Sequence, residues 1–279
     1  KLPKEGAFNG SILEIEDKIL CVYREDEKKF IACFLNKDHK AIHNSFYKLN
    51  LDCVTDPRLI TTPDKKVLLS YSKIPFENRE VIAANIIMDL NVSKNNFFIN
   101  KEIKVSPPNL SDRQKNWVPF IYDSKTFFVA NVCPHEIYEI DVTGEKESIL
   151  KYRTEWKHPW FNNEQLRGST NPVLLADGNY LSTFHTATKI GYAHYYDNGF
   201  YIFEGKPPFK PIFCATKTYL RAEDASEPYF RKHNQILCTF PVGMIIDKEK
   251  ICISYGDNDS CVKILETNLK NAYETMVKL

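Results

Sequence analysis

Residues 53–60 place an acid, a proline and a guanidinium side by side between two stretches of strand-like sequence. Pro57 fixes its own φ and disfavours the α conformation for the residue before it. Asp56 is therefore predicted to be extended or in a turn, where a strand meets a loop. A carboxyl group held there can hydrogen-bond a ligand or donate a proton to it, as a general acid does. The alternative for an isolated Asp-Pro-Arg is a loop aspartate that caps a turn.

The chain alternates short β-type stretches with charged turns almost throughout, and helical periodicity is weak except in residues 268–277. A unit of hydrophobic stretch, turn and aromatic-rich stretch recurs about every 50 residues. An aspartate stands between the first two predicted strands of each unit, at Asp17, Asp64, Asp123, Asp177 and Asp247. Such a repeat predicts an all-β fold, a five-bladed β-propeller. We expect one domain over residues 1–279, with approximate blades 1–50, 51–105, 106–155, 156–210 and 211–267 and a C-terminal tail at 268–279.

Composition and charge narrow the classes of partner. Lys and Arg total 37, and Asp and Glu total 36, so nothing favours a nucleic-acid or membrane-surface partner. No apolar stretch approaches the ~20 residues of a membrane span. The 8 cysteines are scattered without zinc-site spacing, which predicts buried reduced thiols, a cytoplasmic protein and no metal site. A signal peptide removed before Lys1 is the alternative.

A propeller binds ligands at one end of its central channel, using residues from several blades that are far apart in sequence. Each predicted unit offers polar residues of this kind. Each residue could instead have a structural role. His185 stands at the end of an apolar stretch and could be a buried core histidine, and Arg24 could be a surface arginine. The candidates, in chain order, are Asn9, Ser11, Arg24, Asp56, Arg58, Arg79, Lys115, Arg167, His185, Tyr255 and Asp259.

Together these residues resemble glycoside hydrolase family 130, the β-mannoside phosphorylase family of five-bladed propellers. The resemblance covers nearly the whole chain. It rests on Asn9-Gly10-Ser11, Tyr23-Arg24, Asp56-Pro57-Arg58, Arg79, Lys115-Asn116, Asn171-Pro172 with His185, Pro241-Val242-Gly243, and Tyr255-Gly256 followed by Asp259. It implies that Asp56 is the proton donor and that Arg79, Lys115 and His185 bind phosphate. It also implies that Asn9, Ser11, Arg24, Arg58 and Asp259 bind the sugar, with Arg167 and Tyr255 as further candidates.

The resemblance implies inverting phosphorolysis of a β-mannoside or oligosaccharide, giving mannose 1-phosphate, with inorganic phosphate as co-substrate and no cofactor. Phosphate is itself the nucleophile, so the site needs one acid and a cationic pocket. Two positions depart from the family pattern: Thr55 replaces Glu, and Glu80 replaces the Asn that usually follows the phosphate-binding Arg. If Glu80 faces the cleft, hydrolysis becomes possible. Transfer from a nucleotide sugar, a non-catalytic carbohydrate-binding propeller and a homo-oligomer are the open alternatives.

Overall fold

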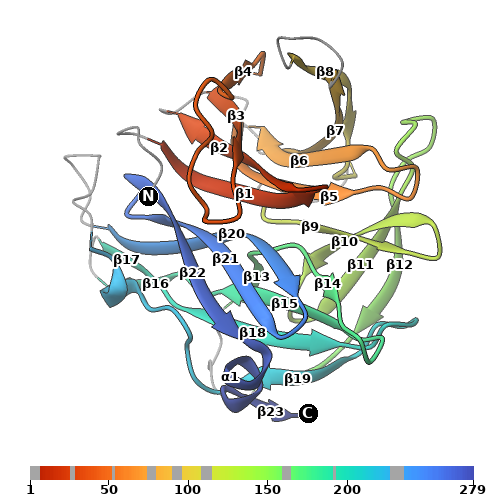
Figure 1. Ribbon diagram of the computed structural model, residues 1–279. Coiled ribbons are helices and arrows are strands. Elements are labelled where there is room, and N and C mark those ends of the chain that lie inside the picture. Colours follow the sequence, from red (N-terminus) through yellow and green to blue (C-terminus); the bar gives the residue numbers. More distant parts are fainter. Residues whose placement is uncertain are drawn as a thin grey trace.

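Five antiparallel or mixed sheets stand in a ring in the computed structural model, and together they form a five-bladed β-propeller (Figure 1). The structure describes residues 7–25, 29–51, 54–73, 80–89, 96–107, 115–158, 165–190, 193–226 and 236–279. The predicted fold class is therefore confirmed. Among the described residues, no helix is long and apolar enough to cross a membrane.

The first three blades are simple four-stranded antiparallel meanders. Blade 1 comprises β1 (Ala7–Ile15), β2 (Lys18–Glu25), β3 (Lys29–Leu35) and β4 (Tyr47–Leu49). Blade 2 comprises β5 (Val54–Thr61), β6 (Val67–Lys73), β7 (Glu80–Asp89) and β8 (Asn96–Lys104). Blade 3 comprises β9 (Val118–Tyr122), β10 (Lys125–Asn131), β11 (His135–Ile140) and β12 (Ile149–Thr154).

The last two blades interleave along the chain. Blade 4 contains β13 (Arg167–Gly168), β14 (Val173–Leu174), β15 (Tyr180–His185), β18 (Asn198–Phe203), β19 (Pro211–Ala215) and the C-terminal β23 (Met276–Lys278). Blade 5 contains β16 (Thr188–Ile190), β17 (Ala193–Tyr196), β20 (Ile236–Asp247), β21 (Lys250–Asp257) and β22 (Cys261–Asn268). The expected division between residues 210 and 211 does not separate these two sheets, because β17 pairs in parallel with β20 far along the chain.

The recurring turns lie where the sequence places them. Asp17, Asp64 and Asp123 lie in the turn between the first two strands of blades 1, 2 and 3. Asp177 lies between β14 and β15 in blade 4, and Asp247 is the last residue of β20, before the turn to β21, in blade 5. These turns use left-handed backbone, with φ of 60° at Lys65, 47° at Asp123 and 84° at Gly178. Short polar residues and glycine tolerate that conformation best, which explains their recurrence. The predicted helical tail is also present as α1 (Leu269–Glu274), capped by the Asn268 side chain accepting from the Asn271 amide at 2.8 Å.

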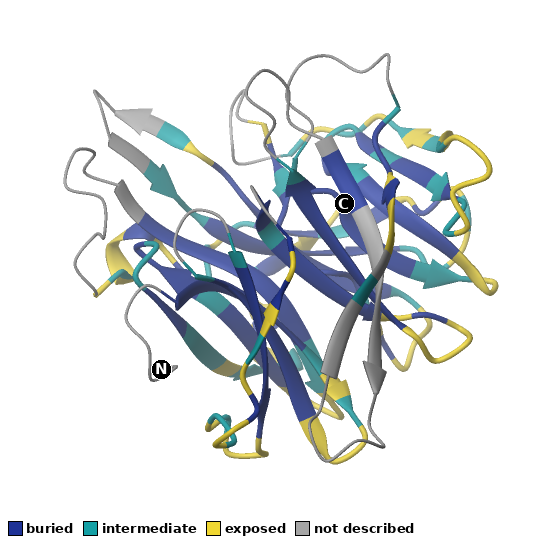
Figure 2. Cartoon of the chain, turned by 90° about the horizontal axis from the view of Figure 1, so that it is seen from above, coloured by how far each residue is buried: buried dark blue, intermediate teal, exposed yellow. Residues whose placement is uncertain are grey.

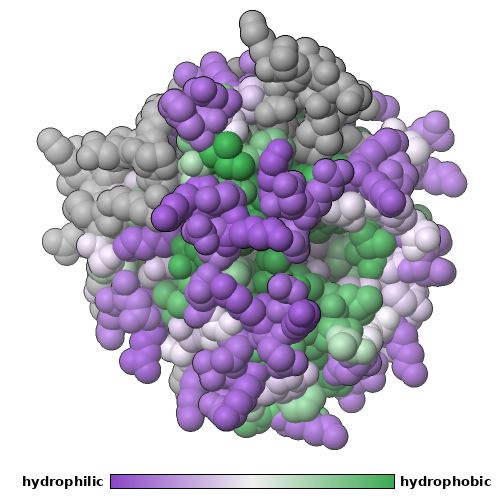
Figure 3. All heavy atoms as spheres, viewed as in Figure 1, coloured by the Kyte–Doolittle hydropathy of each residue, from purple (hydrophilic) through white to green (hydrophobic). Residues whose placement is uncertain are grey.

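Apolar side chains fill the spaces between neighbouring blades, so both faces of most strands are buried at the centre of the ring (Figure 2). One cluster joins blades 1 and 2, another joins blades 2 and 3, and the largest joins blades 3, 4 and 5. A fourth cluster closes the ring by packing Ile12, Cys21 and Cys33 of blade 1 against Cys252 and Val262 of blade 5. Figure 3 shows one end of the ring, where hydrophilic residues lie around and between smaller hydrophobic areas.

Of the described cysteines, all are free thiols and only Cys133 is not buried. They pack as small apolar side chains, as the sequence predicts for this part of the chain.

His135 makes the stability of the blade 3–blade 4 contact depend on pH. Its Nδ1 donates to the Phe209 carbonyl at 2.8 Å, and its Nε2 is buried without a partner among the described residues. Burial lowers the pKa of His135 to about 4, although the bond to Phe209 opposes this shift. The His135 side chain therefore binds a proton more readily in the unfolded chain than in the folded one. The contribution of neutral His135 to the free energy of unfolding is present above pH ~6.5 and is lost as the pH falls towards about 4.

We expect the free energy of unfolding to decrease from pH 6.5 to pH 4, with His135 contributing up to about 1.4 kcal/mol per pH unit. His135→Asn keeps a donor near Phe209 and removes the titration, so it should flatten this slope. Urea unfolding at a series of pH values measures it. An unchanged slope in His135→Asn would show that another group titrates.

Candidate active site

Asp56 occupies a bulge within β5, the edge strand of its sheet and the strand that packs against β1 and β9. Its φ is 56°, and the register of β5 against β6 shifts between Thr55 and Arg58. The residue is thus within a strand and left-handed, whereas the sequence predicted an extended or turn conformation at a strand end. Left-handed backbone is uncommon outside glycine and is often found at functional sites. The bulge leaves the Asp56 side chain half-buried, with Asn9 Nδ2 donating to its Oδ1 at 3.4 Å.

Left-handed polar residues also occur near the first strands of the neighbouring blades. Asn9 has a φ of 50° and lies at a register shift between Phe8 and Ser11 on β1. Asn116 has a φ of 63° just before β9 begins. Left-handed residues therefore recur near the start of the first strand in blades 1, 2 and 3.

Arg58 fixes the backbone of Asp56 and ties blade 2 to blade 4. It is 1 % exposed. Its Nε donates to the Ser169 carbonyl at 2.8 Å, and its other two nitrogens donate to the carbonyls of Asp56 at 2.9 Å and Gly168 at 3.3 Å. Burial lowers the pKa of Arg58 to about 10, against the opposing effect of Asp56. Each guanidinium nitrogen thus already donates to a main-chain carbonyl, which suits a positioning role.

We expect Arg58→Met to lower the free energy of unfolding by roughly 2–4 kcal/mol, because buried carbonyls lose their donors. Arg58→Lys should recover little, since an ammonium cannot reproduce the planar fork. Urea unfolding of both variants measures this. If Arg58→Lys were as stable as the wild type, the three hydrogen bonds from the guanidinium to main-chain carbonyls would not explain how Arg58 stabilises the fold.

His185 lies at the end of β15 with both ring nitrogens engaged by protein side chains. Nδ1 is 2.8 Å from Ser169 Oγ, and Nε2 is 3.3 Å from Asn116 Nδ2. Because the Asn116 amide nitrogen can only donate, Nε2 accepts and Nδ1 carries the proton. Burial is the main cause that holds the pKa of His185 well below its usual range, followed by the charges of Lys115, Arg167 and Arg58. His185 is therefore a neutral imidazole surrounded by cations.

Charged residues from four blades converge on this region. The pKa of the Tyr196 hydroxyl is raised by burial and then by Cys238, Asp56 and Asp259, while Arg167 opposes the shift. The pKa of the Cys238 thiol is raised by burial and by the same two aspartates, while Lys115 opposes it. Asp56, Lys115, Arg167, His185 and Asp259, predicted from distant parts of the sequence, thus share one electrostatic environment.

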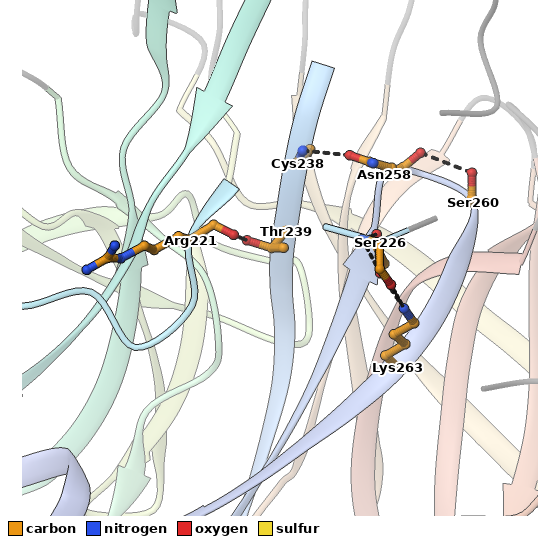
Figure 4. Close-up of polar contacts among 8 residues, drawn as sticks. Arg221, Ser226, Cys238, Thr239, Asn258, Ser260 and Lys263 are labelled. Carbon is orange, nitrogen blue, oxygen red and sulfur yellow. Dashed lines mark hydrogen bonds and ion pairs between the residues drawn. The ribbon is translucent and has the colours of Figure 1, made fainter. Parts of the chain in front are cut away.

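Blade 5 brings Asp259 to the site through close backbone contacts. A Cβ at Gly256 would lie 2.0 Å from Asn9 Oδ1, so only glycine allows β21 to pass Asn9 at this distance. Asn258 has a φ of 49° and accepts from the Cys238 amide through its Oδ1 at 2.8 Å (Figure 4). The turn that carries Asp259, with a φ of 50°, is thereby fixed to β20.

The neighbouring Asp257 is fully buried. It accepts from Lys263 Nζ at 2.5 Å and from the Ser226 amide at 3.1 Å. Figure 4 shows Ser226 and Lys263 together at this place. Asp257 therefore anchors the segment after η1 (Ala222–Asp224) to blade 5.

The remaining predicted residues differ in their surroundings. Ser11 is fully buried, and its hydroxyl accepts from the Leu59 amide at 3.2 Å, which joins β1 to β5. Arg24 lies over the Phe8 ring at 5.0 Å and is largely buried. Tyr255 is half-buried on β21, and burial raises the pKa of its hydroxyl. Arg79 and the side chain of Glu80 lie outside the described residues.

Sequence reasoning did not select Tyr196, Cys238 or Ser169 as site residues. Tyr196 and Cys238 lie opposite each other in the parallel pair of β17 and β20, and Phe240 of β20 packs edge-on against His185 at 4.9 Å. Ser169 holds the His185 ring through its hydroxyl. These side chains are ordinary in their local sequence, so only the pairing of the strands could reveal them.

Residues 7–278 match the family model of glycoside hydrolase family 130, described as beta-1,4-mannooligosaccharide phosphorylase. The chain belongs to this family. It is therefore an enzyme of a family that acts on glycosides, with the phosphorylases and hydrolases of β-mannosidic linkages as its members. No curated protein sequence matches the chain.

Solved structures similar to this chain share its fold. A beta-1,2-mannobiose phosphorylase from Listeria innocua, in complex with beta-1,2-mannobiose, has a TM-score of 0.61 and 13% identity, covering 97% of this chain and 91% of that one. A mannose phosphorylase from Leishmania mexicana, in complex with phosphate, has a TM-score of 0.63 and 9% identity, covering 100% and 88%. A family 130 structure associated with hydrolases that target beta-1,2 mannosidic linkages in Candida mannan has a TM-score of 0.67 and 12% identity, covering 95% and 84%.

Proposed function

We propose that this enzyme catalyses inverting phosphorolysis of a β-mannosidic bond, with Asp56 as the general acid. The observation that carries the proposal is the placement of Asp56, a half-buried carboxyl on strained backbone, in one electrostatic environment with Lys115 and Arg167. A phosphate nucleophile needs such cations, and a leaving oxygen needs such an acid.

Charge supports phosphate as the acceptor. Lys115, Arg167 and Arg58 are the cations that act on His185, and Asp56 and Asp259 are the site carboxylates that act on Tyr196. Lys115 and Arg167 would offset the charge of a bound phosphate dianion. We propose that Lys115 and Arg167 contact phosphate, together with the predicted Arg79. His185, being neutral and bound through both nitrogens, would orient Asn116 and Ser169 and exclude water.

Buried acceptors support a sugar as the ligand. The side-chain oxygens of Asn9, Asn116 and Asn171 are buried without a hydrogen-bond partner among the described residues. Buried acceptors are usually satisfied, and hydroxyl groups of a sugar are suitable donors. We propose that Asn9 and Asp259 bind the sugar beside Asp56, with Arg24 and Tyr255 around them. Ser11 and Arg58 would position these groups through the main chain.

Hydrolysis is the second candidate, and Asp259 favours it. A second carboxylate in the same environment as Asp56 could act as the base that activates water. The two reactions differ in their need for phosphate. The proposal is tested by incubating the enzyme with mannose 1-phosphate and a panel of sugar acceptors and measuring the release of phosphate. A parallel reaction uses GDP-mannose as the donor. Phosphate release supports a phosphorylase, whereas turnover of GDP-mannose alone would establish a transferase.

A further inference from the structure

The ring closes between blade 5 and blade 1 without a shared strand, because β1 to β4 form one sheet and β20 to β22 belong to another. Closure relies on side chains that cross this seam. Figure 1 shows β1 beside β20, in agreement with the packing of β1 against β20, β21 and β22. Away from the proposed active site, the same seam carries an unusual group of side chains.

His39, Cys252 and Glu266 each offer a metal-ligating atom, and these atoms all lie within 4.8 Å of one another. His39 is in the turn between β3 and β4 of blade 1, with a φ of 59°. Cys252 and Glu266 lie directly opposite each other on β21 and β22 of blade 5. The three ligands therefore come from both sides of the seam.

The geometry points to a zinc site at this seam: we propose that His39, Cys252 and Glu266 bind Zn²⁺ and fasten blade 1 to blade 5. Imidazole, thiolate and carboxylate are all zinc ligands, at about 2.0–2.3 Å from the metal, so ligand atoms of one ion are roughly 3.3–3.8 Å apart. His39 Nδ1 and Glu266 Oε1 are already 3.3 Å apart. Only a small closing movement of Cys252 is needed.

The surroundings leave room for a fourth ligand. A cavity of about 570 Å³, lined by Cys21, Asp38, His39, Lys40 and Glu266 among others, adjoins the group. A zinc ion held by three protein ligands can take water as its fourth ligand. The side chains of His39 and Glu266 are 16% and 49% exposed, so the ion can enter from solvent.

Two groups compete with the metal. Lys250 Nζ contacts Glu266 Oε1 at 2.7 Å, and the Cys252 thiol must lose its proton to ligate. Zinc affinity should therefore increase when Lys250 is replaced by methionine.

Metal-free protein, prepared with a chelator, is titrated with Zn²⁺ by calorimetry, and with Co²⁺ to detect thiolate-to-metal charge-transfer absorption. We expect one equivalent of Zn²⁺ to bind, and a hundredfold excess over Kd to raise the thermal midpoint by roughly 5–10 °C. His39→Ala, Cys252→Ser and Glu266→Gln should each weaken binding by at least about tenfold. Lys250→Met should strengthen it.

His43→Ala is the matched control, because His43 is exposed in the same blade 1 connection and outside the group. It should bind zinc as the wild type does. His39 is partly exposed and Glu266 is exposed, and circular dichroism verifies independently that both variants fold. Absence of stoichiometric binding, or binding that persists unchanged in His39→Ala and Cys252→Ser, would overturn the proposal.

Discussion

Asp56→Asn is expected to lower turnover of a β-mannoside by roughly 10²–10⁴-fold, the contribution of a positioned general acid. Asparagine is nearly the same size and tolerates the left-handed φ of 56° as well as aspartate does. The fold and the affinity for sugar should therefore change little, and the thermal midpoint should stay close to that of the wild type. Steady-state rates with and without phosphate, beside a melting curve, measure both effects.

Asp123→Asn is the matched control, because Asp123 is also a left-handed aspartate, with a φ of 47°, but lies in an exposed turn of blade 3. It should retain full activity. If Asp56→Asn turned over substrate at nearly the wild-type rate, another residue would carry the proton.

Lys115→Ala is expected to lower kcat/KM for phosphate by about 10²-fold, as removal of one donor to a developing or bound anion does. Most of the loss should appear as a higher KM for phosphate, and any hydrolysis should survive. Arg167→Ala should act in the same direction, and so should Arg79→Ala if that residue completes the cationic pocket. Initial rates over a range of phosphate concentrations separate KM from kcat.

Lys125→Ala provides the comparison, because Lys125 is an exposed blade 3 lysine that pairs with Glu139 at 3.0 Å. Its removal should leave the phosphate dependence unchanged. An equal loss in the Lys115 and Lys125 variants would indicate a general effect of surface charge. No loss in Lys115→Ala would place phosphate elsewhere.

The repeated fold was predictable because short local sequence patterns specify its strands and turns. Turn residues such as Asp123 and Gly178 recur at the same place in successive blades, where left-handed backbone is required. The exchange of strands between blades 4 and 5 was not predictable in this way. The parallel pairing of Tyr195 with Leu237 joins segments that no local signal connects.

The candidate site also combines features that local sequence predicts with features that depend on how the blades pack. Asp56 could be selected from its proline neighbour and from the family resemblance. The contacts of Arg58 and Ser11 could not be predicted from the sequence. The partners of a buried polar side chain depend on how separate blades pack against each other. His185 shows this most clearly, since burial and the cations around it make it neutral. The proposed zinc ligands have no motif, because His39 meets Cys252 and Glu266 only when blade 1 packs against blade 5.

The most direct test of the central claim is the product formed from β-1,2- and β-1,4-linked mannobiose in the presence of inorganic phosphate, followed by ³¹P and ¹H nuclear magnetic resonance. Inverting phosphorolysis by Asp56 and the Lys115–Arg167 pocket predicts α-mannose 1-phosphate from at least one of these disaccharides, and its loss in Asp56→Asn. Free mannose formed at the same rate with and without phosphate, and no mannose 1-phosphate, would contradict it.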